Sequence, residues 1–334
     1  MDYFKPHEQL IHTRWNRRVT RYCQLIVFYL SKYILKKRIF RISSWISMSW
    51  GKMEHNNWGD DINMFFLKKI TNDTLLPQKV MSFPQSDIVF KVDSNPTITC
   101  IGSILQNIED DNTIVWGSGF LTDKKKPHIR PENILAVRGP LTRQVFISNG
   151  IKCPEVYGDP ALLLPYFYKP KCKKKYQIGI IPHFYDYNKD EVRQYEQSKS
   201  SIIINTFNYR NWKDFIDKIC SCHFIVSSSL HGLIVAEAYN IPNLWVEFNE
   251  PLIDDTTKRF KFHDFFLSIA QDRDYPYTVT RGTPMETLLK QKEKYIKAKG
   301  LSLIPLVEVC PFTIKKSIRK KIIENDLKDT RRRK

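Results

Sequence analysis

The residues best suited to chemistry stand together in Ser227-Ser228-Ser229-Leu230-His231-Gly232, directly after a short apolar run. Hydroxyls, backbone N–H groups and the positive end of a following helix form an arrangement that suits an anion such as a phosphate or a carboxylate. His231 would either bind that anion or transfer protons, and the pattern leaves both roles open. Serines before a helix also act simply as N-caps, so this stretch needs support from the rest of the chain.

Arg138 and His183 each follow an apolar run in the same way. A guanidinium binds phosphate or carboxylate through two hydrogen bonds, although Arg138 in a surface ion pair would leave the same pattern. We therefore predict that Arg138 and His231 are catalytic. The residues predicted to contact the substrate in these stretches are His183, Ser228 and Ser229.

Corners that contain glycine supply further candidates. Asn57 precedes Gly59 and Asp60 where a helix is expected to begin, so the first amides of that helix would face a cleft. Gly117 and Gly119 flank Ser118, and glycines let a backbone approach a ligand closely. Neither corner matches the Gly-x-Gly-x-x-Gly dinucleotide fingerprint. The predicted substrate contacts here are Asn57, Gly59, Asp60, Gly117, Ser118 and Gly119.

Short apolar segments alternate with helical patterns along the chain, which is typical of strand–helix–strand units. Ligands of such units bind outside the carboxyl ends of the strands, where these candidates fall. The alternation occurs on both sides of a basic linker at 169–175. It predicts an α/β fold of two doubly wound Rossmann-like domains, 42–168 and 176–311, which face each other across a cleft in a GT-B-like arrangement. The expected strands are 42–50, 97–104, 113–116, 134–137, 177–182, 201–207, 224–226 and 243–246.

The net charge of +18 is concentrated at the two ends of the chain. Residues 1–41 hold ten Lys and Arg against two acids, and residues 312–334 hold ten against three, which leaves only +3 for 42–311. We predict a basic N-terminal segment, 1–41, and a basic C-terminal tail, 312–334. No nucleic-acid-binding motif accompanies this charge, so a nucleic-acid partner is not expected.

Apolar residues recur at helical spacing from Val19 to Ile34, with Arg21 and Lys32 between them and Arg17 just before. Such a basic amphipathic helix suits an anionic membrane surface, and packing on the protein body is the alternative. Its apolar run is too short to span a bilayer and lacks a cleavage site for a signal peptide. The prediction is a cytoplasmic protein that is peripheral on the inner face of the membrane.

The seven cysteines are odd in number and include no Cys-x-x-Cys motif. This pattern argues against a disulfide framework and indicates a reducing compartment. Cys220 and Cys222, beside His223, are interpreted as core residues, and no metal site is expected.

Seven short motifs occur in order between about Ser49 and Ile269. They are Asn57-Trp58-Gly59-Asp60-Asp61-Ile62-Asn63, Val115-Trp116-Gly117-Ser118-Gly119-Phe120, Ala136-Val137-Arg138-Gly139-Pro140-Leu141-Thr142-Arg143, Gly158-Asp159-Pro160-Ala161, Ile178-Gly179-Ile180-Ile181-Pro182-His183, Ser228-Ser229-Leu230-His231-Gly232-Leu233-Ile234-Val235-Ala236-Glu237-Ala238 and Lys261-Phe262-His263-Asp264-Phe265. With these motifs the chain resembles the polysaccharide pyruvyl transferase family, particularly the exopolysaccharide ketal-pyruvate transferases. The two basic ends lie outside the resemblance.

The resemblance implies transfer of the enolpyruvyl carbons of phosphoenolpyruvate onto two hydroxyls of a sugar, which makes a cyclic ketal and releases phosphate. Phosphoenolpyruvate is then a co-substrate, no other cofactor is expected, and the acceptor is a polysaccharide or a lipid-linked oligosaccharide. Similar enzymes have an arginine at the place of Arg138 and a histidine at the place of His231.

One departure is that many members have arginine where this chain has Ser229. The charge of that arginine is either not needed or supplied elsewhere, with Lys258, Arg259 and Lys261 as candidates. We predict that Lys258 and Lys261 bind substrate. Glu237 lies six positions after His231, which points it away on a regular helix, so it is interpreted as structural.

Two other functions fit parts of the pattern. A nucleotide-sugar glycosyltransferase would hold a diphosphate before Gly232 and a ribose at Glu237. A non-catalytic protein that binds polyanions would use the two basic ends. A pyruvyl transferase would bind phosphoenolpyruvate, whereas the glycosyltransferase would bind a sugar nucleotide. Removal of the basic ends would abolish binding by a polyanion-binding protein but not the intrinsic chemistry of an enzyme.

Overall fold

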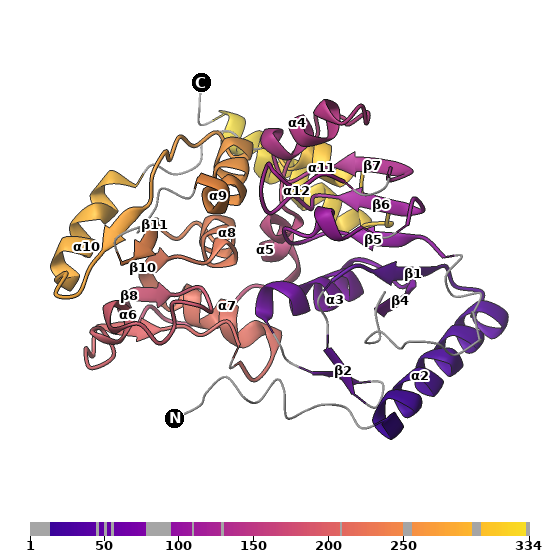
Figure 1. Ribbon diagram of the computed structural model, residues 1–334, viewed down its shortest axis with the longest axis horizontal. Coiled ribbons are helices and arrows are strands. Elements are labelled where there is room, and N and C mark those ends of the chain that lie inside the picture. The colour runs from indigo at the N-terminus through magenta and orange to yellow at the C-terminus, as the bar shows by residue number, and fades with distance from the viewer. Residues whose placement is uncertain are drawn as a thin grey trace.

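A computed structural model describes residues 14–44, 47–49, 52–54, 57–77, 95–108, 110–127, 130–207, 209–249, 256–295 and 302–331. Within these ranges the strands form two parallel five-stranded sheets and one antiparallel pair (Figure 1). This confirms the α/β class predicted from the alternating pattern.

The first sheet has the order β4-β1-β5-β6-β7. In chain order the first strand thus lies between the second and third, an order typical of doubly wound α/β folds. Its strands are short because only a few consecutive residues are buried apolar or β-branched. They are β1 (Ile39–Ile42), β4 (Thr74–Pro77), β5 (Thr97–Thr99), β6 (Thr113–Trp116) and β7 (Asn133–Ala136).

The second sheet repeats the same order, as β12-β11-β10-β8-β9. Its central strands are almost continuously buried, as expected for a parallel sheet covered on both faces. Its strands are β8 (Tyr176–Ile181), β9 (Ser201–Ile203), β10 (Cys222–Ser227), β11 (Asn243–Phe248) and β12 (Tyr277–Val279).

Helices make most of the connections. Those associated with the first sheet are α2 (Arg14–Tyr29), continued by the π-helix η1 (Leu30–Ile34), α3 (Trp58–Ile70), η3 (Leu105–Asn107), α4 (Pro140–Ser148), η4 (Pro160–Leu163) and α5 (Leu164–Phe167). Those that follow are α6 (Asp190–Arg193), α7 (Trp212–Cys220), α8 (Leu230–Ala238), α9 (Thr256–Ser268), α10 (Met285–Gln291), η5 (Lys292–Lys294), α11 (Ile304–Glu308) and α12 (Lys316–Arg331).

The predicted strand at 42–50 is wrong. The core strand is β1, which begins at Ile39, whereas β2 (Ser47–Ser49) pairs only with β3 (Lys52–Glu54). Residues 45–46 and 50 lie outside the described part of the chain. Arg41 concealed β1, because a charged residue in a strand reads as part of a basic tail, yet its buried side chain pairs with Asp110 at 2.9 Å.

Two other expected strands are shorter than predicted. The strand at 97–104 ends at Thr99, and Gly102 has a positive φ of +123°. The side-chain amide of Asn63 replaces a neighbouring strand there, since it accepts from Ile101 N–H at 2.8 Å and donates to Ile101 O at 2.9 Å. The strand at 201–207 ends at Ile203.

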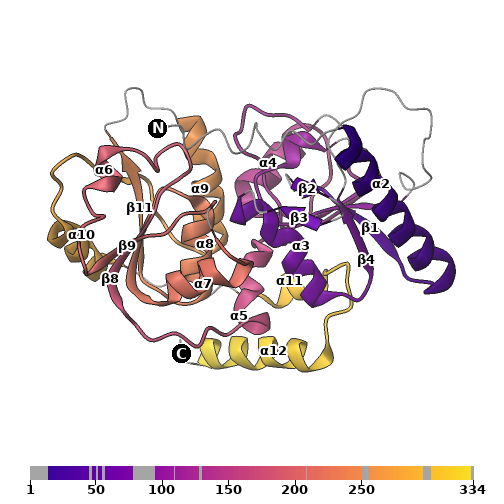
Figure 2. The ribbon, with the colours of Figure 1, turned by 90° about the horizontal axis from the view of Figure 1, so that it is seen from below.

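The C-terminal segment is attached to the body rather than extended as a free tail. Phe312 and Ile322 are buried, and the Phe312 ring meets the Phe40 ring edge-on at 5.1 Å. The indole Nε1 of Trp116 donates to Leu306 O at 2.9 Å. Figure 2 shows α12 running along the edge of the molecule beside α5.

The two sheets share one buried apolar cluster, which includes Ile42 and Ile98 of the first sheet and Ile181 and Ile225 of the second. Trp58 at the start of α3 connects the two sheets through hydrogen bonds. Its indole donates to Trp212 O at 2.7 Å, and its backbone N–H donates to Thr206 O at 2.8 Å. These contacts bring the beginning of α3 against the second sheet.

The predicted N-terminal helix is present as α2 and η1. Phe28 packs against Ile39 and Leu76 of the first sheet, so one side of this helix rests on the body. Along the rest of the helix, apolar side chains remain exposed at Tyr22, Ile26, Val27, Tyr29, Leu30, Tyr33 and Ile34. No helix among the described residues is long and apolar enough to cross a membrane.

Candidate anion-binding site

His231 lies against Gly59, and this contact is the centre of the site. A Cβ atom at Gly59 would lie 2.2 Å from His231 Nδ1, so only glycine leaves room for the imidazole. The Nε2 atom of His231 is buried and has no hydrogen-bond partner among the described residues. A buried polar atom without a partner is costly unless a ligand or water supplies one.

Two helix N-termini meet at this contact, because Gly59 and His231 are the second residues of α3 and α8. Asn57 caps α3, and its side chain accepts from Gly59 N–H at 3.1 Å. Ser229 occupies the N-cap position of α8, but its side chain makes no capping hydrogen bond. The first N–H groups of a helix have no partner within it and carry partial positive charge, so the junction favours an anion.

Cationic groups surround the same point. Burial and then the charges of Lys261, Arg138 and His183 lower the pKa of His231 to about 3. Burial and then Lys261 lower the pKa of His183 to about 4. Burial and then Arg138 lower the pKa of Lys261 to about 8. At pH 7 both imidazoles are therefore neutral, whereas Arg138 and most of Lys261 are charged.

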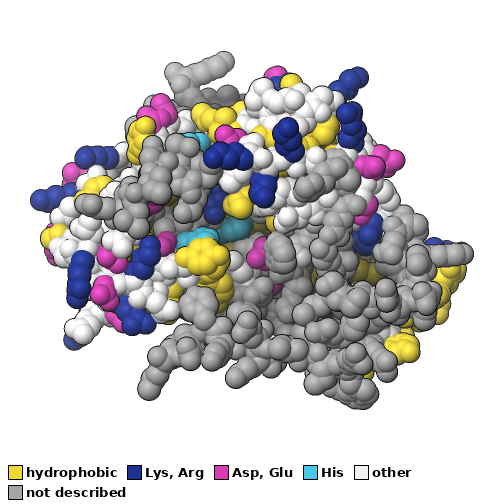
Figure 3. Space-filling view, in the orientation of Figure 1, with side chains coloured by type: hydrophobic (Ala, Val, Ile, Leu, Met, Phe, Trp, Pro, Cys, Tyr) yellow, Lys and Arg dark blue, Asp and Glu magenta, His cyan; other side chains and the backbone are white. Residues whose placement is uncertain are grey.

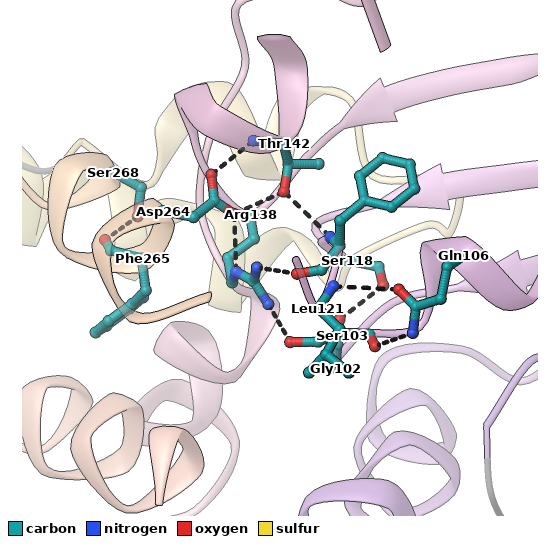
Figure 4. Close-up of polar contacts among 11 residues, drawn as sticks. Gly102, Ser103, Gln106, Ser118, Leu121, Arg138, Thr142, Asp264, Phe265 and Ser268 are labelled. Atoms are coloured by element: carbon teal, nitrogen blue, oxygen red, sulfur yellow. Dashed lines mark hydrogen bonds and ion pairs between the residues drawn. The ribbon is translucent and has the colours of Figure 1, made fainter. Parts of the chain in front are cut away.

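Arg138 is completely buried and forms an ion pair, one of the two arrangements that the sequence left open, but inside the protein rather than on its surface. Figure 4 shows its guanidinium surrounded by acceptors. Nε donates to Asp264 at 2.9 Å, and the two Nη atoms donate to Ser103 Oγ and to Phe120 O. Arg138 is thus a fixed charge beside Lys261 and His231, and its direct contact with a substrate stays a prediction.

Asp264 of α9 joins this cluster to α4. Its carboxylate accepts from Thr142 N–H at 2.8 Å and from Thr142 Oγ1 at 2.7 Å. It thereby caps α4, whose own N-cap residue is the glycine Gly139. Lys261 lies three residues before Asp264, so both residues project from the same side of α9.

The loop Gly117-Ser118-Gly119 was predicted to contact the substrate, and in the structure its glycines lie against Pro160 and Arg138. Gly117 has a φ of +90° and packs against Pro160, and a Cβ atom at Gly119 would lie 2.4 Å from Arg138 Cζ. Ser118 Oγ donates to Gly102 O at 2.8 Å. The loop therefore shapes the surroundings of Arg138.

Ser228 holds the loop that follows β8. Its hydroxyl accepts from His183 N–H at 2.8 Å and donates to Asp186 at 2.7 Å. Asp186 also pairs with Lys189 at 2.7 Å. The structure thus brings His183, Ser228 and His231 together at the carboxyl ends of β8 and β10, where the strand order of the second sheet reverses.

Asp60 and Lys258 were also predicted to contact the substrate, and the structure describes the side chain of Asp60 only. Burial and then the neighbouring Asp61 raise the pKa of Asp60 to about 7, so this carboxyl can give or take a proton near neutrality. Lys258 lies in the first turn of α9, and its side chain is outside the described part of the structure. Arg259 pairs with Glu247 at 3.0 Å. Of the two expected cations whose side chains the structure describes, Arg259 and Lys261, it is Lys261 whose charge acts on His231.

Sequence reasoning missed three residues that position the site: Asp264, Asp186 and Ser103. Asp264 lies in a motif that was recognised, and its spacing of three from Lys261 was a usable signal. Asp186 and Ser103 lie in loops without a pattern, and only the tertiary fold brings them to Ser228 and Arg138.

Other features lie apart from this site. Two surface cavities of about 320 and 340 Å³ flank the linker, where both include Lys169 and Cys172. In the described ranges, no group of three His, Cys, Asp or Glu residues is arranged to hold a metal ion.

Comparisons with known proteins identify relatives that match most of the chain in sequence. A family model described as Polysaccharide pyruvyl transferase matches residues 22–249. The succinoglycan biosynthesis protein ExoV of Rhizobium meliloti (strain 1021) is 29% identical over 249 residues, which cover 71% of this chain and 69% of that protein. The uncharacterized protein L143 of Acanthamoeba polyphaga mimivirus is 28% identical over 222 residues, 65% of this chain and 72% of that protein.

Proposed function

The chain belongs to the polysaccharide pyruvyl transferase family and is a pyruvyltransferase, and from this we propose that its donor is phosphoenolpyruvate and its product a cyclic ketal. The acceptor would be a sugar with two suitably placed hydroxyls in a polysaccharide or a lipid-linked oligosaccharide. The relative from Rhizobium is named for succinoglycan biosynthesis, which supports a polysaccharide as the acceptor class.

The observation that carries the proposal is the meeting of two helix N-termini with Lys261, Arg138 and two neutral histidines. Phosphoenolpyruvate carries a phosphate and a carboxylate, so it requires several positive groups around one point. Binding of this anion would raise the pKa values of His183 and His231, because an opposite charge nearby favours the protonated form.

The reaction needs a proton at the methylene carbon of phosphoenolpyruvate, which leaves an oxocarbenium-like centre at the neighbouring carbon. One sugar hydroxyl attacks this centre, phosphate leaves, and the second hydroxyl closes the ketal. One hydroxyl proton balances the proton placed on the methyl group, and the other leaves with phosphate. In the proposal His231 handles these protons or holds the phosphate, while Asp60 and Lys261 titrate close enough to neutrality to share in proton transfer.

For this role we take the two sheets as two Rossmann-like domains in a GT-B-like arrangement, with the donor between them. The glycosyltransferase alternative is less well supported, because it needs Glu237 for a ribose. Glu237 is buried and accepts from Asn243 at 2.9 Å, Arg273 at 2.8 Å and Tyr295 at 2.9 Å. These bonds fit the structural role expected from the sequence.

We also place the enzyme at an anionic membrane surface in this proposal. The helix that runs from α2 into η1 exposes apolar side chains, and residues 14–38 contain eight Lys and Arg and no acid. An anionic leaflet offers both a hydrophobic boundary and opposite charge, which suits a lipid-linked acceptor.

A thermal-shift titration tests the donor. Phosphoenolpyruvate should raise the melting temperature by mass action, and UDP-glucose should not. Its affinity should fall above about pH 8, because free Lys261 loses its proton there and the anion favours the charged form. Stabilisation by UDP-glucose alone would favour a glycosyltransferase.

A further inference from the structure

Aromatic side chains border the histidines on the second sheet. Phe184 and Tyr185 follow His183, with their ring centroids 3.7 Å apart, and the Phe207 ring meets Phe184 edge-on at 5.8 Å. Tyr185 is 75% exposed, and Phe184 and Phe207 are half-buried. Figure 3 shows hydrophobic side chains beside histidines near the centre of one face of the molecule. We call Phe184, Tyr185 and Phe207 the aromatic shelf.

The shelf is held by the same residues that build the anion site. On one side, Ser228 fixes the loop of Phe184 and Tyr185 through His183 and Asp186. On the other side, Thr206, next to Phe207, accepts from the backbone N–H of Trp58, which precedes Gly59. The rings of Phe184 and Tyr185 also lie 4.5 and 5.3 Å from the ring of His183. The shelf therefore borders the anion site and does not belong to a separate surface.

The rings do not suit the anionic donor. The face of an aromatic ring carries partial negative charge, so it repels a phosphate or carboxylate and attracts groups with partial positive hydrogens. A pyranose ring offers such a face through its C–H bonds and is itself uncharged. Exposed apolar side chains grouped at the edge of a polar site mark a ligand surface rather than a core.

We propose that the aromatic shelf is the acceptor subsite, on which a neutral hexopyranose ring stacks against Tyr185 with its hydroxyls toward His231. This inference rests on the proposed function and extends it to the class and place of the acceptor sugar. Tyr185 acts through its ring, which packs on the Phe184 ring, and Phe207 contacts Phe184 in turn.

Saturation-transfer NMR on the full chain tests the shelf without any donor. The probes are the methyl pyranosides of glucose, galactose and mannose. At least one should receive saturation at its ring C–H protons, and Tyr185→Ala should weaken its binding about tenfold, the scale of losing one aromatic contact. Tyr185→Phe should bind within about twofold of the parent, since the ring is retained.

Tyr275→Ala is the matched control, because Tyr275 is 74% exposed and precedes β12 instead of following a strand of the site. It should bind sugar like the parent. Saturation of none of the probes, or unchanged binding by Tyr185→Ala, would overturn the proposal. So would a loss in Tyr185→Phe or in Tyr275→Ala as large as the loss in Tyr185→Ala. The thermal shift with phosphoenolpyruvate is measured separately, so sugar binding without that shift would reject only the donor.

Discussion

The neutral state of His231 is the residue-scale property with the widest effect. Its folded-state pKa is lowered to about 3, whereas an unfolded histidine titrates near 6.5. Between these values the unfolded chain binds more protons than the native protein. Stability is therefore fully present above about pH 6.5 and falls as the pH decreases toward the folded-state value.

This linkage gives a measurable pH dependence. Between pH 7 and pH 5 the His231 contribution should lower the free energy of unfolding by about 2 kcal/mol. His231→Gln removes the titrating group, so its stability should decline less over that range by about this amount, as measured by urea unfolding. His223→Gln, at an exposed position, is the control. Parallel declines for His231→Gln and the parent would show that burial does not keep this imidazole neutral.

The contact between Gly59 and His231 supports a second prediction. His231→Ala should lower turnover by about 100-fold or more, the scale of losing a proton-transfer group. Gly59→Ala should also reduce turnover by about tenfold or more, because its methyl group would occupy the place of the imidazole.

A double-mutant cycle separates this effect from general damage. Gly59→Ala should cause little further loss in the His231→Ala background, since both changes act on one side chain. Circular dichroism and urea unfolding should show that each variant is folded. Losses that multiply would mean that Gly59 acts independently of His231.

The sequence predicted which residues lie at the site but not which of them are buried or paired with an opposite charge. His231, His183 and Ser228 follow strands, and the rule that ligands bind at the carboxyl ends of parallel strands brought them together. That Arg138 is buried against Asp264 could not be predicted, because the two residues lie 126 positions apart. The charge of an arginine is visible in a sequence, whereas its accessibility depends on distant neighbours.

At the scale of elements, the ion pair between Arg138 and Asp264 joins α9 to α4. Asp264→Ala leaves a buried guanidinium without its counter-charge and removes the cap of α4. It should therefore lower the free energy of unfolding by about 3–5 kcal/mol, as measured by urea denaturation.

The double variant Arg138→Met with Asp264→Leu distinguishes the structural role of the pair from a catalytic one. Apolar replacements of similar volume should restore much of the stability, since no charge remains buried. Turnover should stay about 100-fold low, because the fixed charge beside Lys261 is gone. Recovery of turnover together with stability would assign Arg138 to the fold alone.

Elements were predicted best where burial is continuous. The strands at 113–116, 177–182 and 243–246 agree with the structure to within two residues. The strands at 42–50 and 97–104 failed because Arg41 and Asn63 make contacts at long range. Such side-chain partners leave no periodic signal in the sequence.

At the scale of the whole molecule, basic residues that cluster at the two ends of the sequence do not all lie in separate surface segments. Arg41 belongs to the core, and α12 packs against the body, so the described parts of the two basic ends are attached to the body. The exposed apolar side chains of α2 and η1 form the surface on which the proposed membrane contact depends.

Vesicle sedimentation tests that surface. The protein should sediment with anionic vesicles at low salt, bind neutral ones weakly and be partly released at high salt, because Lys and Arg near an anionic leaflet contribute about 1 kcal/mol each. Ile26→Glu should reduce sedimentation, whereas Ile147→Glu, on exposed α4, should not. Equal binding to neutral and anionic vesicles would contradict the electrostatic part of the mechanism.

The contact between Gly59 and His231 also limits which hybrid chains of two related enzymes can be active. The histidine and the glycine that seats it lie on opposite sides of the linker 169–175, as do Asp264 and Arg138. A hybrid chain joined within that linker from two parents would retain both sheets. To be active, the hybrid would still need a glycine at position 59 to fit His231 from the other parent. It would also need Arg138 from one parent and Asp264 from the other. Recombination at this linker is therefore constrained by two contacts between residues distant from it in sequence.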